Sequence, residues 1–126
     1  MNTQKATKFL AQIHKLDTEL EALLAEADLM QKLAADCDGA NAKSAAVTIR
    51  RYSAKINAKV NQYIGAREKV GSVIENVADD DCRLLLVKRY LHGETWEKIA
   101  EEMNFSAAHI FRLRQKALAL VEKAIQ

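Results

Sequence analysis

The chain has 126 residues, 49% of them hydrophobic and 29% charged, so it is long enough for one ordinary domain or two very small ones and is expected to fold. It has no proline, four glycines and only 6% aromatic residues, a composition without helix breakers or sheet-forming clusters, which predicts an all-α protein. A net charge of +2 excludes indiscriminate coating of nucleic acid, and no apolar run reaches the roughly twenty residues of a membrane span.

The sequence contains little that points to catalysis or metal binding. Cys37 and Cys82 show no CxxC spacing, and the three histidines form neither an HExxH motif nor a Cys/His metal spacing. It has no glycine-rich phosphate loop and no nucleophile elbow. Because no secretory leader precedes the first predicted helix, we expect a cytoplasmic protein that is neither an enzyme nor a carrier of a metal or cofactor.

Two long helices are predicted in the first part of the chain. The first begins near Asn2 or Thr3, ends at a left-handed Gly39 and places apolar residues alternately three and four positions apart: Ala6, Phe9, Ile13, Leu16, Leu20, Leu23, Ala27, Met30 and Ala34. The second runs from about Lys43 to Val77 and repeats apolar residues every seven positions: Ile49, Ile56, Tyr63, Val70 and Val77. Joined by a short loop, they predict a long antiparallel, coiled-coil-like helical hairpin over residues 1–78.

Charge is segregated between these two helices. Residues 1–40 carry a net charge of −3, whereas residues 41–78 carry +5. Glu19 or Glu26 of the first helix is therefore expected to pair with a basic row on the second, formed by Arg51, Lys55 and Lys59. The same row also fits contact with phosphate groups, and this alternative stays open.

Residues 79–126 predict a separate module of three helices. Asp79–Asp81 marks the start of the first helix, because acids cap the free amides of a helix N-terminus, and Gly93 marks its end. Thr95 begins the second helix, whose inward positions are Trp96, Ile99, Ala100 and Met103.

A turn then leads into a helix of different charge. Asn104 is expected to adopt a left-handed conformation, Phe105 to fill the core and Ser106 to cap the third helix. From Ser106 to Leu120 there is no carboxylate, whereas the preceding helix carries acids that we expect on its outer side: Glu97, Glu101 and Glu102. The third helix has one apolar face, formed by Ile110, Leu113, Ala117 and Leu120.

This charge division predicts a helix-turn-helix whose first helix braces the second, while the acid-free second helix enters the major groove of DNA. The predicted DNA-binding residues are Thr95, Ser106, Ala107, Ala108, His109, Arg112, Gln115 and Lys116. A plain three-helix bundle with an incidentally basic surface is the alternative. A second apolar stripe is assigned to the hairpin or to a second copy of the chain: Phe111, Leu118 and Ile125.

The segment LLLVKRYLHGETWEKIAEEMNFSAAHIFRLRQKALALV has a specific pattern. A leucine-rich helix ends in Arg-Tyr, Gly-x-Thr-Trp-x-x-Ile-Ala and aromatic-Ser follow, and the last helix closes on Lys-Ala-Leu. In this pattern, roughly residues 84–126, the chain resembles region 4 of bacterial sigma factors and, more closely, the sigma-like modules of small phage-encoded transcriptional regulators of the ArpU type. The preceding hairpin looks like the N-terminal part of a phage family with such a C-terminus, which implies a role in late or developmental phage transcription.

The resemblance also implies roles for individual residues. It gives Ser106 the cap of the recognition helix and places Ala107, Ala108 and Arg112 at base-reading positions. Alanine can touch a thymine methyl group but forms no hydrogen bond with a base edge. The remaining candidates for reading bases or anchoring phosphates are His109, Arg112, Gln115 and Lys116.

The leading hypothesis is a sequence-specific, double-stranded DNA-binding transcriptional regulator encoded by a phage or prophage. Because one such module buries limited surface, we expect a second module from a homo-oligomer, with a dimer favoured, or from RNA polymerase. The hairpin is the candidate element for either contact. Two alternatives stay open: a small-terminase-like packaging protein whose hairpin builds a ring, and a coiled-coil adaptor whose helix-turn-helix contacts only protein.

Overall fold

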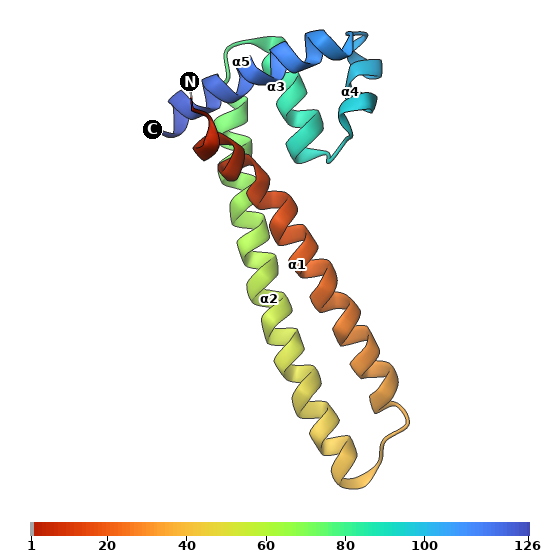
Figure 1. The fold of residues 1–126 in the computed structure, drawn as a ribbon. Helices are drawn as coiled ribbons and strands as arrows, with labels where there is room; N and C mark the ends of the chain where they lie inside the picture. Colours follow the sequence, from red (N-terminus) through yellow and green to blue (C-terminus); the bar gives the residue numbers. More distant parts are fainter. Residues whose placement is uncertain (1) are drawn as a thin grey trace. The chain divides into compact units, whose positions relative to one another are not determined.

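The computed structural model describes residues 2–126 and is built almost wholly of helix (Figure 1). Helices make up 86% of it and the described residues contain no strand, which confirms the predicted all-α class. The elements in chain order are α1 (Gln4–Ala34), α2 (Gly39–Glu75), α3 (Asp80–Leu86), the π-helical segment η1 (Val87–Leu91), α4 (Trp96–Met103) and α5 (Ala107–Ile125). Within residues 2–126, no helix combines the length and the apolar character needed to cross a bilayer.

The chain forms two compact units. One, the core unit, consists of residues 2–14 and 66–126, and the other, the two-helix unit, is Lys15–Gly65. This division falls elsewhere than the predicted boundary at residue 78, because the start of α1 and the end of α2 contribute buried side chains to the core unit: Ala6, Leu10, Ile13, Ala66, Val70, Ile74. Glu122 of α5 also takes part, since its Oε1 accepts a hydrogen bond of 3.2 Å from the backbone N–H of Ala6.

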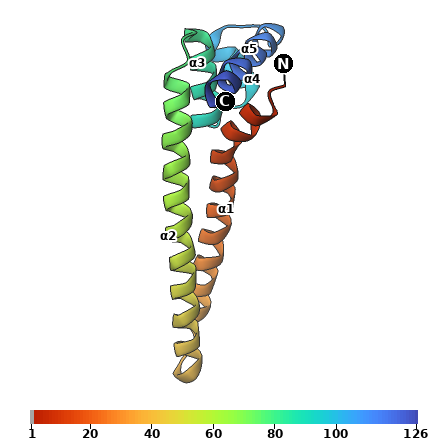
Figure 2. The same cartoon turned by 90° about the vertical axis from the view of Figure 1, so that its left-hand side faces the viewer.

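In the two-helix unit, α1 and α2 lie side by side and run in opposite directions (Figures 1 and 2). Lys59 Nζ lies 2.5 Å from Glu19 Oε2, one of the ion pairs expected from the charge pattern. None of the residues from Lys15 to Gly65 is fully buried. Those half-buried include the residues of the predicted apolar seam: Leu16, Leu20, Leu23, Ala27, Met30, Ala34, Ile49, Ile56 and Tyr63.

The connection between α1 and α2 differs from the expectation. Gly39 does adopt a left-handed conformation, with φ of 61°, but it begins α2 instead of ending α1. α1 ends at Ala34 because the amides of Asp36 and Cys37 turn back to the carbonyls of Leu33 and Ala34, at 3.3 and 3.0 Å. α2 thus begins four residues before the predicted Lys43.

In the core unit, the predicted helix from Asp79 to Gly93 is present in two parts. Asp79 caps α3, with its side chain accepting a hydrogen bond from the amide of Cys82, and Gly93 has a left-handed φ of 69° as expected. The chain between them widens into η1, where His92 N–H donates to the carbonyl of Val87 at 3.0 Å. Arg67 Nη1 donates to the carbonyl of Leu91 at 3.1 Å, so a side chain of α2 satisfies a backbone carbonyl at the end of η1.

The core itself is formed by side chains from α3, α4, α5 and the ends of α1 and α2, whereas η1 contributes no buried residue. Leu85, Leu86, Ile99 and Val121 are wholly buried, together with Cys82. On α5 the expected face is inward, except that Leu118 is also buried whereas Leu120 is only half-buried. This core fixes the positions of α4 and α5, which carry the candidate site.

Candidate nucleic-acid interface

The turn between α4 and α5 is set by local backbone chemistry. Asn104 has φ of 58° and ψ of 43°, the left-handed conformation expected from the sequence, and its amide donates to the carbonyls of Ala100 and Glu101. The amide of Phe105 donates to the carbonyl of Ala100 at 3.0 Å. These bonds satisfy carbonyls that the end of α4 leaves free. α5 begins directly afterwards at Ala107.

Capping residues define the start of both helices. The Thr95 hydroxyl accepts a hydrogen bond from the amide of Lys98 at 3.2 Å, and the Ser106 hydroxyl accepts one from the amide of His109 at 3.1 Å. Ser106 is exposed at the N-terminus of α5, where amide groups and the helix dipole favour a negative charge. Thr95, also exposed, lies on a different element, at the start of α4.

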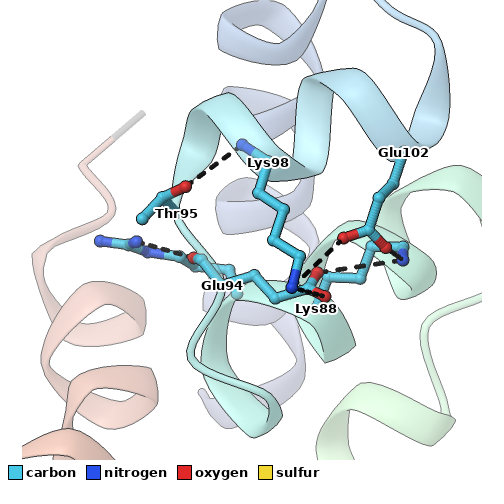
Figure 3. Close-up of polar contacts among 6 residues, drawn as sticks. Lys88, Glu94, Thr95, Lys98 and Glu102 are labelled. Carbon is cyan, nitrogen blue, oxygen red and sulfur yellow. Dashed lines mark hydrogen bonds and ion pairs between the residues drawn. The ribbon is translucent and has the colours of Figure 1, made fainter.

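The acids around α4 are partly committed to contacts within the core unit (Figure 3). Glu102 is exposed, as expected, and its Oε2 lies 2.5 Å from Lys88 Nζ of η1. Glu94 lies within 3.9 Å of Lys88 and 3.8 Å of Lys98. Hydrogen bonding between Lys88 and Glu102 raises the pKa of Lys88 and lowers the pKa of Glu102. These ion pairs therefore help to hold α4 against η1.

Two arginines flank the single tryptophan, Trp96, at the start of α4. The guanidinium carbon of Arg89 lies 4.7 Å from the Trp96 ring centroid and that of Arg114 lies 5.0 Å from it. Arg114 also hydrogen-bonds the Tyr90 hydroxyl, whose pKa is raised by burial although both arginines oppose the rise. Cation–π contacts of this kind orient guanidinium groups within the protein. Arg114, although it lies in the acid-free part of α5, is thus a structural residue.

The outward face of α5 is short. Ala107, Ala108, Arg112 and Gln115 are all exposed, at spacings that place the last three on one side of the helix. Within residues 2–126, Arg112 and Gln115 form no ion pair and no side-chain hydrogen bond. These two side chains are therefore available to a ligand.

His109 and Lys116, also predicted to bind DNA, are held by neighbours. The His109 ring stacks on the Phe105 ring, with centroids 4.0 Å apart. Lys116 Nζ lies 2.7 Å from Asp79 Oδ2. This contact and the amide of Cys82 lower the pKa of Asp79 to about 2, and the same contact raises the pKa of Lys116. Lys116 still exposes 59% of its side chain, but part of its charge is offset by Asp79.

Two features near this face could not be assigned from the sequence. Phe111 exposes 56% of its surface and lies one helical turn from Ala107 and Ala108, so the apolar part of the face is larger than predicted. The C-terminal half of α5 is flanked by the N-terminal segment, since a shallow hollow is lined by Thr3, Gln115, Lys116, Leu118 and Ala119. The exposed side chains of α5 that could contact DNA thus lie between Ala107 and Gln115. Helical spacing in the sequence does place Phe111 off the apolar face of α5, but nothing in the sequence indicates that the N-terminal segment lies beside α5.

Residues 2–126 contain no group of three or more histidine, cysteine or carboxylate side chains placed to hold a metal ion. Among comparisons with known proteins, no family model, no curated protein sequence and no solved structure matches this chain.

Proposed function

We propose that this protein is a sequence-specific, double-stranded DNA-binding transcriptional regulator whose α4 and α5 form a helix-turn-helix. The observation that carries the proposal is the exposed, acid-free start of α5, on which Arg112 and Gln115 have no partner within residues 2–126. Arginine reads guanine and glutamine reads adenine through paired hydrogen bonds in the major groove. The N-terminal residues of a recognition helix are those that reach base edges in this class of motif.

The electrostatics of the two helices support different roles for them. Glu94 and Glu102 are engaged by lysines, which reduces the repulsion that α4 would exert on phosphates. Glu97 and Glu101 remain exposed, so α4 is less suited to lie along a duplex than α5. We therefore assign bracing to α4, and base contact to the face formed by Ala108, Arg112 and Gln115.

Phe111 extends the proposed site beyond the residues predicted from the sequence. Together with Ala107 and Ala108 it forms an exposed apolar group beside Arg112. Apolar side chains in the major groove contact the methyl group of thymine. The preferred sequence should accordingly place thymine next to the bases read by Arg112 and Gln115.

The biological setting is part of the same proposal. The resemblance of residues 84–126 to sigma-like modules favours a phage or prophage regulator that acts with RNA polymerase in the cytoplasm. One recognition helix gives a small interface, so we propose that DNA is bound by a homo-oligomer, most simply a dimer. A small-terminase-like ring is the competing assembly, and the mass of the protein in solution distinguishes the two.

The test is selection of bound sequences from random duplexes, followed by titration of a preferred and a random duplex. Arg112→Ala should weaken binding to the preferred duplex by at least roughly tenfold, as expected for one base contact, and weaken random binding much less. Lys123→Ala removes one exposed charge from the far end of α5 and is the matched control. Absence of binding at low ionic strength, or equal losses for the two duplexes, would overturn the proposed base reading.

Replacing thymine by deoxyuridine in the preferred duplex removes only the methyl group. Binding should weaken about two- to tenfold at thymines that contact the apolar group, as expected for loss of one apolar contact. The Phe111→Ala variant should be insensitive to the replacement. If both proteins respond equally, Phe111 is not a base-contacting residue.

A further inference from the structure

The two-helix unit has two unlike sides. Two interactions, both on one side, fix the register of α1 against α2: Glu19 with Lys59, and Glu26 with the Tyr52 hydroxyl, whose pKa this hydrogen bond raises. The next residue in sequence after each member of a pair is rotated by about 100° around the axis of its helix. Because the helices are antiparallel, this rotation carries both following residues to the same, opposite side of the pair.

That opposite side carries an apolar group beside polar residues such as Asp17 and Asn57. Leu20 follows Glu19 and Val60 follows Lys59, and these two residues lie at nearly the same level of the pair. Leu24 and Ile64 come one turn further along their own helices, which places them at the two ends of this group because the helices are antiparallel. Leu24 and Ile64 expose 49% and 51% of their surface, although they are among the largest apolar side chains of the unit. We call the exposed Leu24 and Ile64, together with the half-buried Leu20 and Val60 that lie between them at the border of the seam, the apolar face.

The two edges of the apolar face carry opposite charges. On α1 the edge is formed by Asp17, Glu21 and Asp28, whereas on α2 it is formed by Lys43 and Arg50. α2 has no carboxylate at all between Gly39 and Arg67. Lys32 pairs with Asp28 at 2.9 Å, and this exposed pair is weak enough to exchange partners.

We propose that the apolar face is the site at which a second copy of this chain binds, with α1 of each copy lying over α2 of the other. A two-fold axis parallel to the helices brings the acidic edge of one copy onto the basic edge of its partner, twice over. The other face-to-face arrangement sets acid against acid and base against base. The charge pattern therefore favours both a second copy as the binding partner and this relative orientation of the two copies.

The register of the unit identifies one contact between the copies. Glu19 lies level with Lys59 and Glu26 with Tyr52, so Asp28 lies level with Arg50. In the proposed dimer the Asp28 of one copy faces the Arg50 of the other, on both edges. Within residues 2–126, Arg50 has no ion pair and no side-chain hydrogen bond. In this dimer the second copy would cover apolar side chains of Lys15–Gly65 that are exposed or only half-buried in the single chain.

The experiment measures the mass of the full chain, without DNA, by light scattering and sedimentation. The wild type should reach twice its monomer mass of 14.1 kDa. Leu24→Glu and Ile64→Glu should each raise the dimer dissociation constant by at least roughly tenfold, because a charge would be buried in the interface. Leu33→Glu is the matched control: Leu33 is 56% exposed but lies off the apolar face, and its variant should still dimerise.

Charge reversal tests the orientation. Asp28→Arg and Arg50→Asp should each weaken the dimer, by about two- to fivefold for an exposed pair, and the double variant should regain affinity. Helical circular dichroism separates loss of pairing from loss of folding. A monomeric wild type, a ring of many copies, or a dimer that tolerates Leu24→Glu would overturn the proposal. Because no DNA is present, failure here removes the dimer from the proposed function but leaves base reading by α5 standing, and failure of DNA binding leaves the proposed dimer standing.

Discussion

The core unit and the two-helix unit use the same helical spacing of apolar residues with different results. Every fully buried apolar side chain of residues 2–126 lies in the core unit, and none lies between Lys15 and Gly65. In the core unit, α3, α4, α5 and the ends of the two long helices surround each apolar stripe. In the two-helix unit each stripe has one neighbour, so its residues are only half covered.

The comparison shows that a heptad pattern predicts a helix but does not predict that its stripe is buried. Hydrophobic stabilisation follows the area removed from water, and half-covered residues contribute about half as much as wholly buried ones. The core unit should therefore carry most of the stability of the monomer. It is also the unit that holds the proposed DNA-binding face in a fixed position.

The largest effect is expected from truncating the core. Leu85→Ala removes a wholly buried side chain and should lower the free energy of unfolding of the core unit by about 2–5 kcal/mol. Ile56→Ala, at a half-buried seam position, should cost about 1–2 kcal/mol, and should affect the two-helix unit alone.

Two signals in urea unfolding separate these effects. Trp96 is the only tryptophan and lies in the core unit, so its fluorescence follows that unit, while circular dichroism at 222 nm follows both. Leu85→Ala should move the fluorescence midpoint and Ile56→Ala only the circular dichroism. If Ile56→Ala moved the fluorescence midpoint as far as Leu85→Ala did, the stated contrast between the units would be wrong.

The next effect concerns the cap of α5. Ser106→Ala leaves the amide of His109 without its side-chain acceptor and should lower the stability of the core unit by about 1 kcal/mol. Ser106→Asp keeps an acceptor and should keep the stability. It also places a negative charge at the start of the proposed recognition helix, so DNA binding should weaken while the fluorescence midpoint of urea unfolding stays in place. Equal DNA binding by the two variants would remove this terminus from the interface.

Local features of the fold were predictable because they depend on near neighbours in the sequence. The left-handed Asn104 and Gly93 and the caps at Asp79 and Ser106 follow from side-chain and backbone chemistry within a few residues. The same holds for the exposure of Arg112 and Gln115, since helical spacing alone turns them away from Ile110 and Leu113. Their role in DNA binding stays a prediction.

Other features were not predictable because they depend on residues far apart in the chain. The pairing of Glu102 with Lys88 depends on how α4 meets η1, and nothing in the sequence indicates the π-helical widening at Val87–Leu91. The contact of Ala6 with Glu122 joins residues near opposite ends of the chain. For Lys116, helical spacing predicted exposure correctly, but it could not reveal that Asp79 binds the same ammonium group.

A smaller, pH-dependent effect is expected at this last contact. The pKa of Asp79 is lowered from 3.8 to about 2 in the folded protein, mainly by Lys116. The stability that the ionised carboxylate contributes is present above about pH 4 and is lost as the pH falls towards 2. Asp79→Asn should therefore lower the melting temperature at neutral pH, and the difference from the wild type should disappear near pH 2.

The same substitution frees Lys116 while asparagine still caps α3. If Lys116 contacts phosphate, Asp79→Asn should strengthen DNA binding although it weakens the fold. Asp80→Asn removes an equal charge at an exposed position next to Arg83 and serves as the control. Weaker DNA binding by Asp79→Asn than by Asp80→Asn would mean that Lys116 acts only within the fold.

The last effect is one of reaction rate and concerns the two thiols, which lie in different units. Cys37 is exposed in the two-helix unit, whereas Cys82 is buried in the core unit, where burial and the nearby Asp79 raise its pKa to about 12. Since the thiolate is the reactive form, one thiol per folded chain should react with a thiol reagent at pH 8, and the second only after unfolding. In the Cys37→Ser variant the slow labelling of Cys82 then reports opening of the core unit alone, and Leu85→Ala should accelerate it whereas Ile56→Ala should not. Labelling of Cys82 as fast as that of Cys37 would show that the core unit is no better protected than the two-helix unit.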